Sequence, residues 1–191
     1  MTTIEPIELR DCEWSDCRHE LRRRAGRLAT GNVWAEFGTA TGASAQDLLS
    51  VLPQDGVLYL HDSWQGLPTA WDKGEKVLAA GTFKGPAPSL NDPRAVIRKG
   101  LFAKTLPYAF GPLGLVHVDC DLYESARDVL FGCDDDIVDG TILMFDELSS
   151  IHYQKWREGE YRALCEWREA TGKQVRWIGA SVGSAFGVVH E

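Results

Sequence analysis

Short apolar runs along the chain predict β-strands that alternate with amphipathic helices. The predicted strands cover residues 33–37, 56–61, 95–98, 113–118, 141–145, 175–178 and 185–190. The predicted helices cover residues 14–29, 43–52, 123–131 and 155–171. Ser15 is expected to cap the first helix and Gly172 to end the last one. This alternation predicts an α/β fold, a parallel sheet with helices on both faces, and the final hairpin requires one antiparallel strand.

The segment from residue 63 to residue 93 falls outside this alternation. It is rich in Gly, Pro and Trp and is predicted to be irregular. Loops of this length tend to carry function when they are ordered. Trp64, Trp71 and Phe83 are candidates to cover a bound substrate, although core packing is an equally good interpretation.

The composition is that of one folded, cytoplasmic domain. The chain has 191 residues, of which 44% are apolar and 25% charged, which is enough for a full core. A formal net charge of -8 argues against nucleic acid or an anionic membrane as the partner. No apolar run is long enough to cross a bilayer, and the first residues lack the pattern of a secretory signal.

The basic run near the N-terminus and the cysteines are explained by solvation and by packing. Arg22, Arg23, Arg24 and Arg27 are expected to form the solvated face of the first helix. The cysteines have neither zinc-site spacing nor an even number, so reduced packing thiols are expected. They are Cys12, Cys17, Cys120, Cys133 and Cys165.

A glycine loop follows the first predicted strand, in the segment VWAEFGTATGASAQDLL. Such a loop lets backbone amides approach a ligand closely, and ligands of open α/β sheets bind at this edge. Gly38 and Gly42 do not follow the GxGxxG pattern of dinucleotide loops. Glu36 suits a ligand with an ammonium group, and Asp62, after the next strand, could accept hydrogen bonds from ribose hydroxyls. Both features point to S-adenosylmethionine (SAM), although Asp62 could also only cap a turn.

Two further strands end in pairs of acids, in LGLVHVDCDLYESARDVL and GTILMFDELSS. If the strands are adjacent and parallel, their carboxyl ends lie about 4.8 Å apart. Two like charges 4 Å apart repel by about 4 kcal/mol at an effective dielectric constant of about 20. The acids therefore predict a divalent cation such as Mg²⁺, unless they face apart as loop caps. They are Asp119, Asp121, Asp146 and Glu147.

Two histidines lie close to these acids in the sequence. His117 alternates with apolar residues inside a strand, which is typical of a core histidine that has a hydrogen-bond partner. His152 follows the second acidic pair. It could face a substrate or lie on the surface.

Together, these segments resemble the macrocin O-methyltransferase family, which includes metal-dependent sugar and phenol O-methyltransferases of antibiotic pathways. The matching segments, which span roughly residues 33–165, are AEFGTATGASAQDLL, LHDSWQGLP, GLFAKTLP, VHVDCDLYESARDVL, GTILMFDEL and GEYRAL. The resemblance implies a Rossmann-like class I methyltransferase fold, with a seven-stranded, mostly parallel sheet whose last strand is antiparallel. Residues 31–191 would form this domain, preceded by an N-terminal helical segment at residues 1–30.

The resemblance also assigns roles to residues of this chain. It implies that Asp121 is the general base and that Asp119, Asp146 and Glu147 hold a divalent metal, with Mg²⁺ the expected ion. The residues expected to bind SAM lie in the glycine loop and after the second strand: Glu36, Gly38, Thr39, Ala40, Gly42, Ser44, Asp62, Ser63 and Trp64.

The expected activity is methyl transfer to a hydroxyl of a small natural product, with a vicinal diol or catechol as the natural acceptor. The family often has two aspartates where this chain has Asp146 and Glu147, and its longer N-terminal region forms a lid and subunit contacts. A homo-oligomer is therefore compatible with the resemblance but is not specified by this chain. Three other functions stay open: a Rossmann-like oxidoreductase, a catalytically silent SAM-binding protein, and a metal-independent methyltransferase that acts on another atom.

Overall fold

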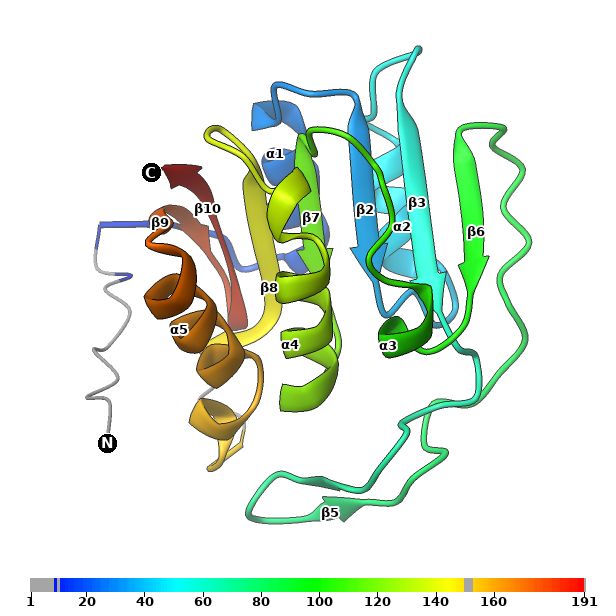
Figure 1. Cartoon of the computed structure of the whole chain (residues 1–191), viewed down its shortest axis with the longest axis vertical. Coiled ribbons are helices and arrows are strands. Elements are labelled where there is room, and N and C mark those ends of the chain that lie inside the picture. Colours follow the sequence, from blue (N-terminus) through cyan, green and yellow to red (C-terminus); the bar gives the residue numbers. More distant parts are fainter. Residues whose placement is uncertain (1–8, 10, 150–152, 191) are drawn as a thin grey trace.

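The computed structural model describes residue 9, residues 11–149 and residues 153–190. At its centre lies an eight-stranded sheet in the order β6-β3-β2-β7-β8-β10-β9-β1 (Figure 1). These strands are β1 (Glu13–Trp14), β2 (Val33–Phe37), β3 (Val57–Asp62), β6 (Ala95–Lys99), β7 (Leu115–Val118), β8 (Ile142–Ser149), β9 (Gln174–Ala180) and β10 (Gly183–His190). The helices are α1 (Arg18–Leu28), α2 (Ala43–Leu49), α3 (Phe102–Thr105), α4 (Tyr123–Gly132) and α5 (Glu160–Thr171), with short 3-10 turns η1 (Asp134–Asp136) and η2 (Trp156–Glu158).

The sheet confirms the predicted topology. Strand β10 is antiparallel to both β8 and β9, whereas the pairs β2/β3, β2/β7, β3/β6 and β7/β8 are parallel. The seven predicted strands are all present. An eighth, β1, lies at the edge of the sheet, parallel to β9, and was not predicted, because two exposed residues are too few to give a periodic pattern.

Helices cover both faces of the sheet, as predicted. Figure 1 shows α1 and α2 behind the sheet and α3, α4 and α5 in front of it. Alternate residues of the central strands feed two separate cores, so Trp34 packs on the α1/α2 side and Phe37 on the α4/α5 side. Among the described residues, no helix has both the length and the apolar character needed to cross a membrane.

Several boundaries differ from the prediction, and three of them bear on the site. Helix α1 begins at Arg18 with Cys17 as its N-cap, so the expected cap at Ser15 is wrong. Strand β8 runs on to Ser149, which places the second acidic pair inside the strand and not after it. Helix α5 begins at Glu160, because the chain before it forms a 3-10 turn.

The segment 63–93 is not wholly irregular. It contains a small antiparallel hairpin of β4 (Trp71–Asp72) and β5 (Val77–Leu78). In Figure 1 this hairpin lies beyond the carboxyl ends of β2, β3 and β6, at the edge where a ligand of an open α/β sheet binds. The five cysteines of the chain are free, as expected.

Candidate functional site

The glycine loop brings two strand ends into backbone contact. Gly38 has a φ of 95°, and a Cβ atom built on it would lie 1.7 Å from the carbonyl oxygen of Asp119. No side chain fits at that position, so only glycine lets the loop after β2 pack on the loop after β7. Gly42, at a φ of 84°, then caps α2. The predicted cofactor loop and the first predicted acidic pair therefore meet at one edge of the sheet.

Asp62 ties the glycine loop to the start of the segment 63–93. Its Oδ2 accepts a hydrogen bond from the Ala40 amide at 2.8 Å, and its Oδ1 accepts one from the Trp64 amide at 2.7 Å. The Trp64 indole N–H donates to the Ala40 carbonyl at 2.9 Å, and both of these residues have positive φ angles, 43° for Ala40 and 53° for Trp64. Asp62 thus caps turns and also borders the cavity described next.

A cavity of about 520 Å³ opens beside these loops. Four of the nine residues expected to bind SAM line it: Gly38, Ala40, Asp62 and Ser63. The other five lie away from its wall: Glu36, Thr39, Gly42, Ser44 and Trp64. Apolar parts of the wall come from the segment 63–93, from the chain around α3 and from the start of α4: Leu67, Pro68, Phe83, Leu101, Phe102 and Leu122.

The charge of the cavity wall is negative. Among the described residues that line it, five are Asp or Glu and none is Lys or Arg, and burial raises the pKa of one of the five, Asp119, well above its usual value. The carboxylates are Asp62, Asp119, Asp121, Glu124 and Asp128. Such a wall attracts a cationic ligand and repels a phosphate-bearing one.

Glu36 lies in the core and not in the cavity. Its Oε1 is 2.9 Å from Nδ1 of His117, and both side chains are fully buried. The prediction that His117 is a core histidine with a hydrogen-bond partner is confirmed. Because Glu36 is engaged with His117, its contact with an ammonium group stays a prediction. His152 lies outside the described residues.

Asp121 and Glu147 carry strongly perturbed carboxyl groups. Burial, together with the Glu147 charge and against the opposing Lys73 ammonium, raises the pKa of Asp121 to about 7. Burial and the Asp146 charge raise the pKa of Glu147 to about 7. Asp121 adopts a left-handed backbone conformation with a φ of 61° and lines the cavity. A carboxyl group with this pKa at a cavity wall is typical of a proton acceptor in catalysis.

Asp146 lies in different surroundings, on the α1 side of the sheet. Arg18 donates to its Oδ2 at 2.7 Å, Ser184 donates to its Oδ1 at 3.0 Å, and the Arg22 guanidinium lies 3.7 Å away. Arg22 is itself buried and bonds Asp47 at 2.9 Å. The expected solvated face of α1 is therefore wrong for Arg22, because the buried acids of α2 and β8 need a counter-charge.

Of the three expected metal ligands, Asp119 and Asp146 come together, whereas Glu147 does not join them. Within the described part of the chain, His117, Asp119 and Asp146 each offer a ligand atom within 4.8 Å of the others, and Glu147 is not in this set. Asp146 already binds Arg18, and a metal would have to displace that guanidinium. As arranged, the residues do not fit a divalent cation held by Asp119, Asp146 and Glu147, and Mg²⁺ binding stays a prediction.

Glu160 is a site residue that the sequence analysis missed. Its fully buried carboxylate accepts hydrogen bonds from the Cys120 amide at 2.7 Å, the Asp121 amide at 3.2 Å and the Glu147 amide at 3.1 Å. One side chain thus fixes both acidic motifs. The signal was the GEYRAL segment, but an acid in the first turn of a helix is ordinarily explained by the helix dipole.

Comparison with known proteins finds similarity to methyltransferases. A family model described as a methyltransferase domain matches residues 35–148, more than half of the chain. The solved O-methyltransferase NovP is 21% identical over 90% of this chain and 78% of its own, with a TM-score of 0.70. The calicheamicin methyltransferase CalS11 is 21% identical over 89% of this chain and 76% of its own, with a TM-score of 0.69. An O-methyltransferase from Bacillus cereus in complex with SAH is 12% identical over 94% of this chain and 84% of its own, with a TM-score of 0.58. No curated protein sequence matches the chain.

Proposed function

The chain belongs to the methyltransferase domain family, as a class I SAM-dependent enzyme, and we propose that it methylates a hydroxyl group of a small molecule. The resemblance to the macrocin O-methyltransferases supports this acceptor class. So do the names of two similar structures, which describe O-methyltransferases. By the same resemblance, the acceptor is a sugar or phenol of natural product biosynthesis, with a vicinal diol as its reacting group.

The observation that carries the proposal is the placement of Asp121. Its carboxyl group lines the same cavity as the glycine loop and Asp62, and its pKa is about 7. A general base works best when its pKa lies near the working pH. A methyl acceptor that enters this cavity would meet a proton acceptor beside the cofactor.

The negative cavity wall supports SAM over a dinucleotide. SAM, when bound, supplies a methyl group on a positively charged sulfonium. The five carboxylates of the wall, with no Lys or Arg among the lining residues described, stabilise that charge and the ammonium group of the same ligand. They would repel the pyrophosphate of a nicotinamide cofactor, which makes the oxidoreductase alternative the weaker one.

In the proposed step, the acceptor oxygen forms a bond to the methyl carbon while the bond from that carbon to sulfur breaks. Asp121 accepts the hydroxyl proton, so the products are a methyl ether and the neutral thioether S-adenosylhomocysteine (SAH). Leu67 and Phe83 line the opening from the segment 63–93 and limit the entry of water. Glu160 holds the backbone of Asp121 in place during the reaction.

Metal assistance, which the family resemblance implies, is no part of this step. Because Asp146 is bound to Arg18 and Glu147 lies outside the set that could share an ion, no residue role is derived through a metal. A small-molecule acceptor is the partner we propose, in the cytoplasm, without nucleic acid or membrane.

The proposal is tested by measuring SAH formation from SAM with a panel of diols, catechols and sugars. The matched control for each acceptor is its analogue with the reacting hydroxyl replaced by hydrogen. We expect SAH only with the hydroxylated member of a pair. SAH formation that depends on an amine or a carboxylate in the acceptor would overturn the choice of oxygen, and SAM binding without turnover on any acceptor would favour a silent binding protein.

A further inference from the structure

Strand register brings four polar side chains together at the carboxyl edge of the sheet, on its α1 side. Glu36 of β2 pairs in register with His117 of β7, and His117 pairs with Met144 of β8. Because side chains alternate along a strand, residues two positions apart point to the same face. Asp119 follows His117 by two residues, and Asp146 follows Met144 by two. The neighbouring strands β2, β7 and β8 (Figure 1) thus gather one histidine and three acids.

His117 has one engaged ring nitrogen and one without a partner. Nδ1 lies 2.9 Å from Oε1 of Glu36, whereas Nε2 is buried and has no hydrogen-bond partner among the described residues. An ionised carboxylate only accepts hydrogen bonds, so Nδ1 carries the proton and Nε2 keeps its lone pair. The whole side chain is shielded from solvent, and a buried nitrogen without a partner is unusual in a folded protein. This nitrogen is therefore available to a metal ion.

Two carboxylates complete a set of ligands with this histidine. His117, Asp119 and Asp146 each offer a ligand atom within 4.8 Å of the others. Ligand atoms that bind one zinc ion at about 2.0–2.2 Å lie up to about 4.4 Å apart, so small side-chain movements bring this set to coordination distance. Asp119 also lines the cavity, which gives an ion a path from solvent to the buried histidine.

The surrounding contacts are those typical of a metal site. A histidine that binds a metal usually donates its other ring N–H to a carboxylate, which is the role that Glu36 has beside His117. A ligating carboxylate is usually hydrogen-bonded in turn, and Ser184 donates to Oδ1 of Asp146 at 3.0 Å. An imidazole nitrogen with two carboxylates suits a transition-metal ion such as Zn²⁺, whereas Mg²⁺ prefers oxygen ligands alone.

Arg18 competes with an ion for Asp146. It donates to Oδ2 of Asp146 at 2.7 Å, and it also donates twice to the carbonyl of Val182, at 3.1 Å and 2.9 Å. Its side chain is 36% exposed, so the guanidinium can leave Asp146 and turn toward solvent. Removal of the guanidinium should therefore favour an ion at this carboxylate.

We propose that His117, Asp119 and Asp146 form a binding site for a transition-metal ion such as Zn²⁺, which takes the place of Arg18 on Asp146. This site differs from the one that the family resemblance implies, because it uses a histidine nitrogen and does not include Glu147. The proposal concerns binding alone and does not rest on the proposed methyl transfer. It is therefore tested in the absence of SAM.

The test titrates chelator-stripped protein with ZnCl2 and with MgCl2 in a calorimeter. We expect the wild type to bind one Zn²⁺ with a Kd of about micromolar magnitude or lower, and Mg²⁺ at least about 100-fold more weakly. His117→Gln should weaken Zn²⁺ binding at least about tenfold, because the nitrogen ligand is lost. The matched control is His61→Gln, which replaces a fully buried histidine of β3 outside the set and should bind Zn²⁺ like the wild type.

A second variant tests the competition without touching the buried ligands. Arg18→Met keeps much of the apolar stem and should bind Zn²⁺ at least about threefold more tightly than the wild type. Its control is Arg27→Met, on the same helix, where the guanidinium is paired with Glu20 and not with the set. Zn²⁺ affinities of Arg18→Met below that of the wild type would contradict the competition.

NMR of wild-type protein labelled with ¹⁵N at histidine identifies the ligand directly, even if His117→Gln does not fold. One equivalent of Zn²⁺ should shift the Nε2 resonance of His117, while its Nδ1 stays protonated. Zinc that shifts only other histidines would overturn the proposal. So would a folded His117→Gln protein with the Zn²⁺ affinity of the wild type, or a lack of Zn²⁺ binding by both the wild type and Arg18→Met.

Discussion

Asp146 and Glu147 are consecutive residues of β8, but their carboxylates lie in opposite surroundings. Asp146 faces α1, where Arg18, Arg22 and Ser184 surround it. Glu147 makes none of these contacts, and burial together with the Asp146 charge raises its pKa to about 7. The Asp146 carboxylate thus belongs to a complete ion-pair network, whereas the Glu147 carboxyl group is buried outside that network.

We infer from this difference that the α1 side contributes to stability, whereas the cavity edge serves the reaction. The α1 side resembles a buried structural network, in which removing one partner leaves an unpaired charge in the core. At the cavity edge, carboxyl groups are kept in an unfavourable environment that makes them reactive, and strongly perturbed pKa values of this kind cluster at functional sites. Substitutions on the two sides should therefore have opposite consequences.

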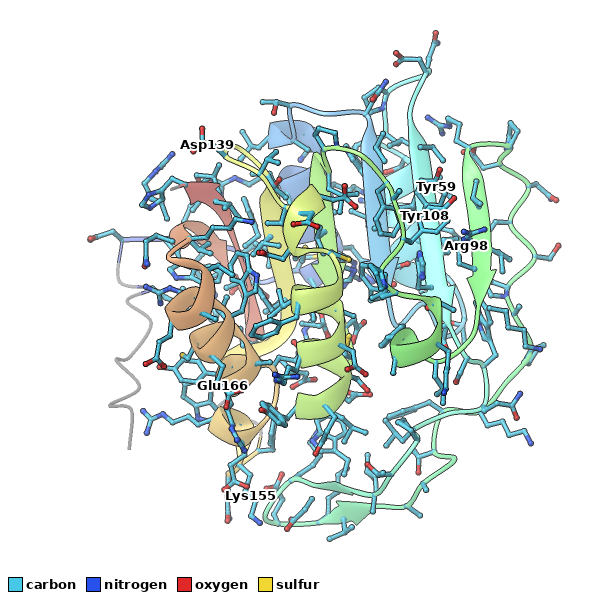
Figure 2. All side chains as sticks on the ribbon, in the orientation of Figure 1. Tyr59, Arg98, Tyr108, Asp139, Lys155 and Glu166 are labelled. Carbon is cyan, nitrogen blue, oxygen red and sulfur yellow. The ribbon has the colours of Figure 1, made fainter. Side chains whose placement is uncertain are left out.

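The largest effect is expected from Asp121→Asn on the cavity side. It should lower turnover by about 10²- to 10⁴-fold, because it removes the proton acceptor. SAH affinity should stay within about threefold of the wild type, since the glycine loop is untouched. The control is Asp139→Asn, at an exposed position on the other end of the sheet (Figure 2). Normal turnover by Asp121→Asn would remove Asp121 from the mechanism.

On the α1 side, Asp47→Ala should lower the free energy of unfolding by about 3–5 kcal/mol. Asp47 bonds Arg22 and Arg23, and its loss leaves the buried Arg22 guanidinium without its closest partner. Urea denaturation measures the change. Asp55→Ala, at an exposed position, should change stability by no more than about 0.5 kcal/mol. Equal effects of the two variants would contradict a structural role for the network.

Glu160 connects the two acidic motifs, so Glu160→Ala should lower both the stability of the fold and the turnover. It removes the acceptor of three backbone amides, and we expect a loss of about 3 kcal/mol in unfolding free energy together with reduced turnover. Glu160→Gln, which keeps one acceptor oxygen, should lie between this variant and the wild type. Glu169→Ala, exposed on the same helix, is the control. A Glu160→Ala protein that behaves like this control would show that the loops hold their positions without it.

The smallest expected effect is a pH dependence of stability. Asp121 and Glu147 have raised pKa values, so the folded protein binds more protons than the unfolded chain between about pH 4 and pH 7. Their contribution to stability is therefore present at low pH and is lost as pH rises through about 7. Urea denaturation at pH 5 and pH 8 should show a smaller pH effect in Asp121→Asn than in the wild type. An identical pH effect in both proteins would speak against the raised pKa of Asp121.

The sequence predicts the sheet well because its central strands have strong local signals. Strand β2 is predicted at its observed bounds, since its apolar run ends in glycine. Strand β8 extends beyond its predicted end, because Asp146 can be buried only with Arg18, which lies 128 residues earlier in the chain. A pairing of that kind leaves no periodic pattern.

The sequence predicts only part of the candidate site, because contacts between residues far apart in the chain leave no periodic pattern. Gly38, Asp62 and Asp121 lie at or just after strand ends, and the parallel sheet brings these strand ends together. Glu160 reaches the site from the first turn of a helix, where tertiary packing brings it to both acidic motifs. The GEYRAL segment marks it, but an acid at a helix start is ordinarily explained by the helix dipole.

The central claim is that the cavity beside the glycine loop binds the SAM cofactor. Calorimetric titration of the wild-type protein with SAH tests it most directly. We predict saturable binding at one site with a Kd of about micromolar magnitude, with or without Mg²⁺. No binding under either condition would contradict the claim and would leave Gly38, Asp62 and Asp121 without the cofactor that their positions imply.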